Sequence, residues 1–398
     1  MIQHCPTPTE LDDLELLVSG AYAPLTRFNE PGSPVTLGLP GDATEAELVD
    51  PEGLPLARVS SDGTVEPLPH AQYGPFRRLH LTPAQVREQH AGATFVPVVD
   101  ALGEVELEEV RGLGRVVLVA LTGTGTADLS PVALVRASLA AADLLDDAHV
   151  VAVPLPSHGD ADVDHELGAQ VVATYAAGDP VHALTSDAGG RVDRYPAGIA
   201  EIVAADRPEP EDQGLVLFFT GLSGSGKSTL ARALMDLLLE QGGRSVTSLD
   251  GDVVRRHLSA GLTFSKADRE TNIRRIGWVA AEIARHGGVA VCSPIAPFAE
   301  TREQVQQMVE DAGGAFFLVH VATPLEECER RDRKGLYAKA RAGEIPEFTG
   351  ISSPYEEPED PAVRVDTTGR TIEDALDDVL VALDEAGFLH LTSEAPDA

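Results

Sequence analysis

Apolar and amphipathic stretches alternate regularly along the second half of the chain. Continuous apolar runs are typical of strands buried on both faces, and they predict strands at residues 215–220, 244–250, 289–293, 316–322 and 363–366. Between them, apolar residues recur at helical spacing and predict helices at residues 266–286, 300–310 and 371–386. Strands that alternate with helices form parallel sheets, so we expect an α/β fold with ligands beyond the carboxyl ends of its strands.

The first half of the chain has a less regular pattern. Up to about residue 110, short apolar runs separated by Pro- and Gly-containing turns predict a β-rich region with one helix at residues 9–19. Buried strands at residues 116–120 and 150–153, with a helix at residues 131–145 between them, then predict a small α/β domain. We therefore expect a β-rich domain, a small α/β domain, a polar linker and a larger α/β domain at residues 1–110, 111–206, 207–213 and 214–398.

A phosphate-binding motif lies between the first strand of the larger domain and the helix that follows it. Residues 221–228 read Gly-Leu-Ser-Gly-Ser-Gly-Lys-Ser, a full match to G-x-x-x-x-G-K-[ST] in the strand–turn–helix context that this P-loop requires. Its glycines let backbone N–H groups surround phosphates, and the helix start adds positive charge. Lys227 would reach the outer phosphates and Ser228 would offer its hydroxyl to Mg²⁺. The predicted residues of this ATP site are Gly221, Leu222, Ser223, Gly224, Ser225, Gly226, Lys227, Ser228 and Thr229.

Two carboxylates follow the next predicted strand, where they would face the phosphate loop. We assign Asp250 to the Mg²⁺ together with Ser228, and Asp252 to the proton of an attacking hydroxyl, although the sequence leaves the reverse assignment open. The alternative is a turn whose aspartates only cap the next helix. Arg269 and Asn272 share one face of the following helix and could bind anionic oxygens and a purine edge, or form a solvated face.

Charge and composition restrict the partners. A net charge of −34 argues against a nucleic-acid or anionic-membrane surface, yet 14 of the 30 Lys and Arg residues lie between Arg255 and Arg341. The three cysteines are far apart, which gives no sign of a disulfide framework or a cysteine metal site. No signal sequence or membrane-length apolar run is visible, so we expect a cytoplasmic protein.

Several sequence words of the C-terminal half resemble those of adenylylsulfate (APS) kinases. Besides the phosphate loop, they occupy residues 249–255, 264–265, 268–269, 272–275, 334–337, 339–343 and 348–351, in the order seen in that family. The resemblance implies a P-loop NTPase-type parallel sheet. It also implies transfer of the γ-phosphoryl group of ATP to the 3′-hydroxyl of adenosine 5′-phosphosulfate, giving PAPS and ADP with Mg²⁺.

The same resemblance implies an APS pocket. Its residues would be Asp252, Arg255, Phe264, Arg269, Asn272, Ile295, Lys339 and Phe348. Phe264 and Phe348 would sandwich the adenine, although from the residues alone both rings could equally belong to the core.

Residues 330–355 are charged and contain glycine, which is typical of a lid that closes over both nucleotides and excludes water. Within this segment, Arg331 is expected to pack on the ATP adenine. Many APS kinases carry a serine where this chain has Ala296, so we expect direct in-line transfer without a phosphoserine.

The N-terminal half resembles part of another family. Residues 14–26 and 50–53 are similar to the PUA-like β domain of ATP sulfurylases, and residues 111–206 correspond in placement to a shortened sulfurylase catalytic domain. The ATP-binding words Q-x-R-N and H-x-G-H of that family do not occur. His149, His158, His165 and His182 stand singly, as surface or internally satisfied histidines do. We therefore expect a relic without sulfurylase activity.

Three rival hypotheses accompany this interpretation. They are a bifunctional sulfurylase and kinase, a non-catalytic sensor of APS or PAPS, and a kinase of another small hydroxylated metabolite. The expected partners are ATP and APS, without nucleic acid or membrane. The resemblance further implies a homodimer, and it leaves open an association with a separate ATP sulfurylase.

Overall fold

The computed structural model describes residues 2–41, 43–70, 74–185 and 195–389. The chain divides into two compact units, Met1–Arg207 and Pro208–Ala398. The division falls at the start of the stretch that the sequence predicts as a linker. Each unit is described by itself.

Unit 2 is built on a five-stranded parallel sheet with the order β12-β11-β8-β10-β9. Its strands are β8 (Leu215–Thr220), β9 (Val246–Leu249), β10 (Val289–Cys292), β11 (Ala315–Val321) and β12 (Val363–Val365). Its helices are α7 (Lys227–Gln241), α8 (Gly251–His257), α9 (Lys266–Arg285), α10 (Ala299–Asp311), α11 (Leu325–Arg331), α12 (Leu336–Arg341) and α13 (Ile372–Glu385). The predicted α/β fold with a parallel sheet is confirmed.

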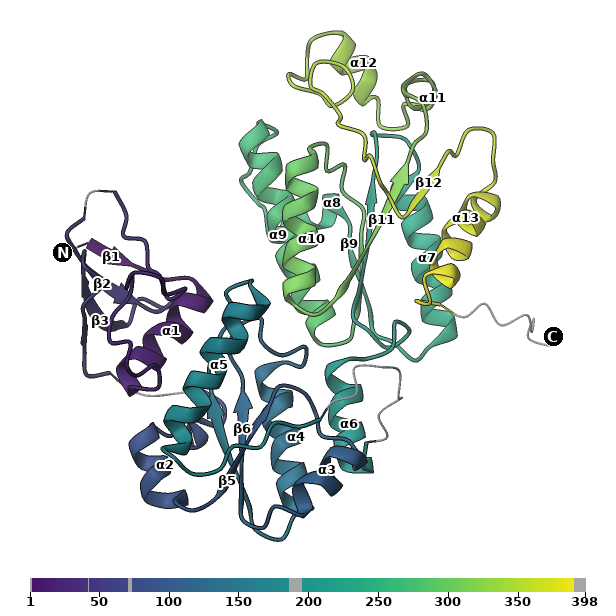
Figure 1. Ribbon diagram of the computed structural model, residues 1–398. Coiled ribbons are helices and arrows are strands. Elements are labelled where there is room, and N and C mark those ends of the chain that lie inside the picture. Colours follow the sequence, from purple (N-terminus) through teal and green to yellow (C-terminus); the bar gives the residue numbers. More distant parts are fainter. Residues whose placement is uncertain (1, 42, 71–73, 186–194, 390–398) are drawn as a thin grey trace. The chain divides into compact units, whose positions relative to one another are not determined.

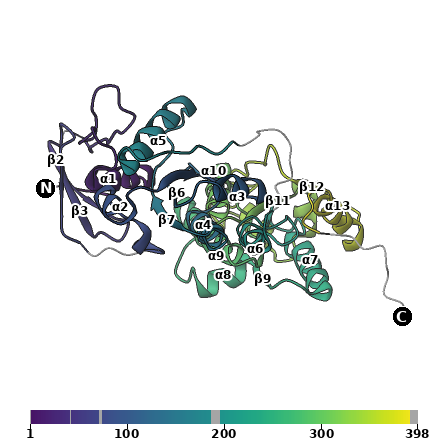
Figure 2. The ribbon, with the colours of Figure 1, turned by 60° about the horizontal axis from the view of Figure 1, so that its bottom comes forward.

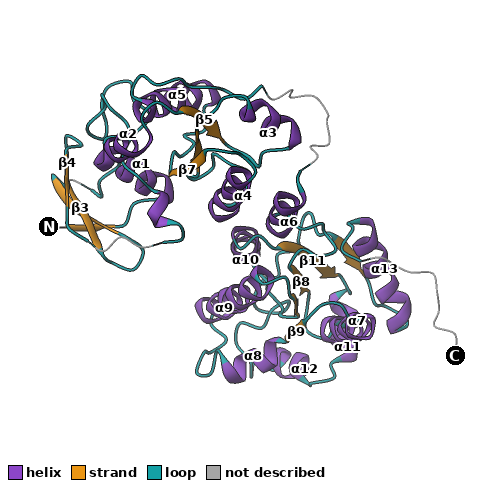
Figure 3. Ribbon diagram, turned by 90° about the horizontal axis from the view of Figure 1, so that it is seen from below, coloured by secondary structure: helices purple, strands orange, loops and turns teal. Residues whose placement is uncertain are grey.

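Helices cover both faces of this sheet (Figures 1 and 3). Alternate residues of the central strand β8 explain why: Leu217 and Phe219 pack in the cluster that α7 and α13 share, whereas Val216 and Phe218 pack in the cluster of α9 and α10. A strand buried on both faces needs a continuous apolar sequence, which β8 has. Gly277 lets α9 approach α10 closely, because a Cβ there would lie 2.5 Å from Val305 Cγ2.

Unit 1 contains two small sheets. In the first, β1 (Ile2–His4) pairs in parallel with β2 (Glu45–Val49), and β3 (Pro55–Ser60) and β4 (Val65–Pro67) continue antiparallel. The second is parallel and has the order β5 (Thr94–Val98), β6 (Val116–Leu121) and β7 (Ala148–Val153). The helical elements are α1 (Pro8–Ser19), η1 (Arg77–Leu79), α2 (Pro83–His90), α3 (Glu104–Arg111), α4 (Pro131–Asp143), α5 (Ala161–Ala176) and α6 (Ala197–Asp206).

One core cluster joins these two sheets. Leu16 of α1, Leu48 of β2, Val119 of β6 and Val171 of α5 all belong to it. Figures 1 and 2 show α1 between the first sheet and α5. Strand β5 pairs with β6, although the sequence-based division at residue 110 puts the two in different domains. The domain boundary at residue 110 stays a prediction. In the structure, β5 belongs to the same parallel sheet as β6 and β7.

The described residues contain no helix whose length and apolar character would suit a membrane crossing.

Candidate active site

The phosphate loop connects β8 to α7 at the carboxyl end of the sheet. Gly221 has φ +148°, and a Cβ at this position would lie 2.4 Å from the carbonyl oxygen of Val321. Gly226 has φ +105° and precedes the first residue of α7, Lys227. Both glycines adopt backbone conformations that other residues rarely take, so the loop can curl at the positive end of a helix. All the predicted ATP-binding residues at 221–229 lie in this loop and the first turn of α7.

Lys227 is 7 % exposed. Its Nζ donates a hydrogen bond to the carbonyl oxygen of Leu222, 2.6 Å away inside the loop. Burial lowers the pKa of Lys227 to about 8, because a charged ammonium is costly away from water. A phosphate in the loop would supply the anion that this cation lacks.

Two threonines bind the backbone of the phosphate loop. Thr323 Oγ1 and Thr367 Oγ1 donate to the carbonyl oxygen of Ser225, at 3.0 and 2.9 Å.

Arg331, which we expected on the ATP adenine, donates to Thr367 Oγ1 at 2.8 Å and to Thr367 O at 2.9 Å, and its Nε pairs with Glu327. The structure thus places Arg331 next to Thr367, and its contact with the ATP adenine stays a prediction. The sequence analysis missed both threonines, whose one signal is that they follow β11 and β12.

Asp250 is the N-cap residue of α8, and its carboxylate accepts hydrogen bonds from two hydroxyl groups. Ser228 Oγ and Ser293 Oγ donate to its Oδ2, at 3.0 and 3.1 Å, and the N–H of Asp252 donates to its Oδ1 at 3.0 Å. Burial opposes ionisation, but the hydrogen bonds from Ser228, Asp252 and Ser293 prevail and lower the pKa of Asp250. Ser293 is a further residue that the sequence analysis did not assign to the site.

This arrangement fits a hard divalent cation. Ser228 and Asp250 place a hydroxyl and an ionised carboxylate side by side, which are oxygen ligands of the kind that Mg²⁺ prefers. Among the described residues, no group of three His, Cys, Asp or Glu side chains could hold a metal by itself. The remaining ligands would come from phosphate oxygens and water, as is usual for Mg²⁺ at nucleotide sites.

Asp252 lies in the first turn of α8 with an exposed carboxylate. Lys334 Nζ, from the turn between α11 and α12, lies 2.7 Å from Asp252 Oδ2. Tyr337 of α12 is buried and donates from its hydroxyl to the carbonyl oxygen of Ser223, at 2.8 Å. The predicted lid segment therefore contacts both the phosphate loop and the proposed base. The sequence analysis gave no role to Lys334 or Tyr337.

The predicted APS-binding residues divide into buried and exposed groups. Arg269 is 9 % exposed and donates to Thr349 Oγ1 and Ser353 Oγ, both at 3.0 Å. Asn272 is 4 % exposed, and its Oδ1 has no hydrogen-bond partner among the described residues. An unpaired buried oxygen is costly, so this amide is available for a ligand. The backbone oxygen of Ile295 already accepts from Thr220 Oγ1 at 2.7 Å.

The aromatic rings of the predicted pocket have separate neighbours. The guanidinium of Arg255 lies 4.5 Å from the ring centre of Phe264, which is 64 % exposed. Phe348 packs edge-on against Tyr337 with 5.1 Å between ring centres. The ring contacts found among the described residues do not include one between these two phenylalanines, and Lys339 is exposed on α12. Phe264 therefore does not belong to the core, and the adenine sandwich stays a prediction.

Ala296 is buried and has φ 44° in the loop after β10. Its carbonyl oxygen accepts a hydrogen bond from Arg302 Nη1 at 2.8 Å. No hydroxyl is present at this position, and the nearby hydroxyl of Ser293 is held by Asp250.

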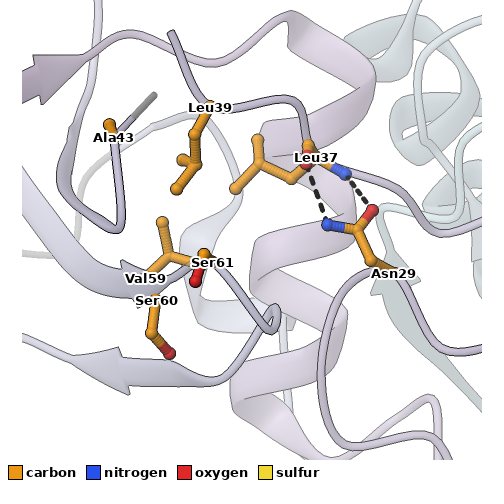
Figure 4. Close-up of a pocket in the computed structure, with 7 residues that line it drawn as sticks. All are labelled: Asn29, Leu37, Leu39, Ala43, Val59, Ser60 and Ser61. Atoms are coloured by element: carbon orange, nitrogen blue, oxygen red, sulfur yellow. Dashed lines mark hydrogen bonds between the residues drawn. The ribbon is translucent and has the colours of Figure 1, made fainter. Parts of the chain in front are cut away.

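Unit 1 contains a cavity of about 210 Å³, far from this chemistry along the chain. Figure 4 shows its lining, which is mostly aliphatic with two serines and Asn29. The amide of Asn29 is already used, because it exchanges hydrogen bonds with the backbone of Leu37. Among the described residues that line the cavity, none carries a charged side chain.

Comparison with known proteins agrees with the geometry of unit 2. Residues 213–366 match the family model described as adenylylsulphate kinase. A sulfate adenylyltransferase of Neosartorya fischeri is 47 % identical over 194 residues, which are 49 % of this chain and 34 % of that protein. A sulfate adenylyltransferase of Phaeosphaeria nodorum is 47 % identical over 195 residues with the same coverage. The chain thus spans about a third of the length of the curated relatives that it matches.

Two solved structures extend the comparison. The APS kinase of Mycobacterium tuberculosis in complex with AMPPNP and APS is 47 % identical, with 43 % of this chain and 98 % of that chain covered and a TM-score of 0.42. The hexameric APS kinase from Thiobacillus denitrificans is 28 % identical with a TM-score of 0.74, and the match covers 98 % of this chain and 94 % of that one. Through residues 213–366, this chain belongs to the adenylylsulfate kinase family.

Proposed function

We propose that the protein transfers the γ-phosphoryl group of ATP to the 3′-hydroxyl of adenosine 5′-phosphosulfate. The observation that carries this proposal is the convergence of three groups at the carboxyl end of one parallel sheet. They are Lys227 in the phosphate loop, Asp250 with its two hydroxyl partners, and Asp252 beneath the lid. Phosphoryl transfer depends mainly on positioning and on charge stabilisation, and these groups supply both.

In the proposed transfer, one P–O bond forms while another breaks. The 3′-oxygen of APS forms a bond to the γ-phosphorus while the bond from that phosphorus to the bridging oxygen breaks, and its electron pair stays on the β-phosphate of ADP. The hydroxyl proton passes to the carboxylate of Asp252. Lys227 holds the outer phosphates through its charge. The lid, which Tyr337 joins to the loop, keeps water from competing with the hydroxyl.

In this proposal Ser228 and Asp250 hold Mg²⁺ with ATP. The ion would neutralise charge on the phosphate oxygens. Ser293 keeps the Asp250 carboxylate in position by donating to the same oxygen as Ser228 does. On the acceptor side, Asn272 Oδ1 and Arg269 Nε have no hydrogen-bond partner among the described residues, and in this proposal they contact the purine and the anionic groups of APS.

Replacing the proposed base tests this function. We expect Asp252→Asn to lower kcat for PAPS formation by about 10²- to 10⁴-fold, because the hydroxyl proton loses its acceptor. Binding of Mg-ATP, measured by calorimetry, should change little. Asp236→Asn, an exposed acid on α7, is the matched control and should keep normal turnover. Unchanged turnover of Asp252→Asn would remove Asp252 from the mechanism.

The rival functions make different predictions. A bifunctional enzyme would release pyrophosphate from ATP and sulfate, which we do not expect because the sulfurylase words are missing. A sensor would bind APS without turning over ATP. A kinase of another metabolite would be indifferent to APS.

The proposal also includes the assembly of the protein and its location. The homodimer stays a prediction, and the relative from Thiobacillus denitrificans is described as hexameric. A native mass measurement on the full chain distinguishes the two states. Association with a separate sulfurylase and a cytoplasmic location stay predictions as well.

A further inference from the structure

The loop between β10 and α10 contacts several parts of the candidate site. Ser293 donates to the carboxylate of Asp250 at 3.1 Å. The backbone oxygen of Ile295 accepts from Thr220 Oγ1 at 2.7 Å and from the N–H of Gly221, the first residue of the phosphate loop, at 3.4 Å. Ile295 is also a predicted APS-binding residue. The backbone path of this loop therefore relates the acceptor side of the site to the phosphate loop.

One residue of this loop has an uncommon backbone conformation. Ala296 follows Ile295 and has φ 44°, in the left-handed region that residues other than glycine seldom adopt. Its side chain is a methyl group that packs in the apolar cluster of α9 and α10, so it forms no hydrogen bond that would favour this conformation. Such a conformation persists where the surrounding structure fixes it.

Arg302 of α10 fixes the loop at this point. It is 4 % exposed, and it donates from Nη1 to the carbonyl oxygen of Ala296 and from Nη2 to that of Glu356, both at 2.8 Å. Glu356 donates its N–H to the carbonyl oxygen of Pro297 at 2.8 Å, and its carboxylate accepts the N–H of Ala299 at 2.7 Å. The residues that follow the lid and the side chain of Arg302 thus hold the loop together.

An arginine suits this position for a geometric reason. Its planar guanidinium can donate to two oxygens at once in a fixed arrangement, which an amide or an ammonium group cannot reproduce. Burial lowers the pKa of Arg302, because a cation is costly away from water. The protein accepts this cost at a residue whose hydrogen bonds go to the backbone of the loop.

We propose that Arg302 is a positioning residue, which holds Ala296 in its left-handed conformation and thereby keeps the carbonyl group of Ile295 turned toward the phosphate loop. This inference rests on the proposed function and deepens it. Arg302 itself contacts neither substrate. Without its two hydrogen bonds the loop relaxes, and only a fraction of the molecules keeps the conformation that binds APS. The apparent affinity for APS falls by that fraction.

Replacing Arg302 with glutamine tests the inference. We expect Arg302→Gln to raise the KM for APS about 5- to 30-fold, which corresponds to the usual cost of a left-handed residue. Saturating APS selects the competent conformation again, so kcat should stay within about threefold. The Kd for Mg-ATP, measured by calorimetry, should also stay within about threefold.

A second substitution distinguishes positioning from a general loss of stability. Glycine adopts positive φ as readily as negative φ. Adding Ala296→Gly to Arg302→Gln should therefore lower the raised KM for APS at least about threefold. Arg302→Lys keeps a charged donor and should raise the KM less than Arg302→Gln does. It replaces Arg302→Gln in both measurements if the glutamine variant does not fold, as judged by circular dichroism.

Arg244→Gln is the matched control. Arg244 also donates to two backbone oxygens, those of Gln213 and Gly287, but at the amino end of the parallel sheet. Its replacement should leave the KM for APS within about twofold of that of the unmodified protein.

The outcomes separate this inference from the function on which it rests. If the unmodified protein forms no PAPS, the proposed function fails. If it forms PAPS and the Arg302 variants keep their KM for APS, the inference alone is wrong. It is also wrong if Ala296→Gly leaves the raised KM unchanged, because Arg302 would then act by a route other than the backbone of Ala296.

Discussion

Lys227 needs a positive charge for its proposed task, yet it occupies a position that disfavours one. Burial lowers its pKa to about 8, so near and above this pH a growing fraction of the free protein carries a neutral amine. Bound phosphates favour the ammonium form and raise the pKa again. Binding of ATP is therefore linked to proton uptake.

We expect Mg-ATP binding to take up about half a proton at pH 8 and almost none at pH 6.5, because Lys227 is already protonated at the lower pH. Apparent affinity should fall as the pH rises from 8 to 9. Calorimetry in two buffers of different ionisation enthalpy measures the uptake. Lys227→Arg, which stays charged throughout, is the control. Equal and near-zero uptake at both pH values would contradict the low pKa.

The sequence predicted those site residues whose roles depend on neighbours along the chain. The spacing of the loop indicated Lys227 and Ser228, and in the structure Ser228 Oγ donates a hydrogen bond to Asp250 Oδ2 at 3.0 Å. Thr323 and Thr367 could not be found in this way, because their roles depend on a contact with Ser225 that only the folded sheet creates.

The histidines of unit 1 illustrate the same limit. We expected single histidines to be exposed or internally satisfied, and His158 lies 3.2 Å from Asp13 Oδ2 and 3.4 Å from Asp164 Oδ1. Asp13 also accepts a hydrogen bond from Tyr22 at 2.5 Å. The type of environment could be expected from the sequence, but these partners could not.

At the scale of elements, the lid is the segment that the structure clarifies most. Its composition suggested a flap at residues 330–355, but the short helices α11 and α12 were not predicted. Helices of one or two turns have too few residues to show a period, and their stability comes from tertiary contacts. At the far end of the lid, Glu356 is fixed by hydrogen bonds to Pro297 and Arg302, both at 2.8 Å.

The contact between Tyr337 and the phosphate loop predicts a measurable effect. Tyr337→Phe keeps the ring but removes the hydrogen bond to Ser223, a loss of about 0.5–1.5 kcal/mol for a typical bond. The lid should close less often, so that kcat falls about two- to twelvefold and ATP hydrolysis without APS rises relative to transfer.

Tyr175→Phe provides the matched control, because Tyr175 is also buried and donates to a backbone oxygen, that of Leu81 in unit 1, at 3.1 Å. It should leave the ratio of hydrolysis to transfer unchanged. If both variants behave alike, Tyr337 has no special part in lid closure.

At the scale of the whole molecule, each unit has its own core, and the sequence predicted the two to different degrees. The regular alternation of unit 2 indicated its strands and longer helices, because parallel sheets need apolar strands and intervening crossovers. In unit 1, the sequence-based division assigned β5 to the β-rich domain that precedes it. In the structure β5 pairs with β6, which follows it in the chain after helix α3. Pairing at this distance leaves no local signal.

The similarity to the APS kinase from Thiobacillus denitrificans covers 98 % of this chain and so includes residues of both units. The curated relatives are sulfate adenylyltransferases of which the chain spans about a third. Unit 2 carries the converging groups on which the proposed activity depends.

The most direct measurement follows the phosphoryl group itself. Purified full-length protein is incubated with Mg-ATP labelled in the γ-phosphate and with APS, and the nucleotide products are separated and quantified. The proposed function predicts the label on the 3′-oxygen of APS, in an amount equal to the ADP formed. Label in inorganic phosphate alone, or ADP formation at the same rate without APS, would contradict it.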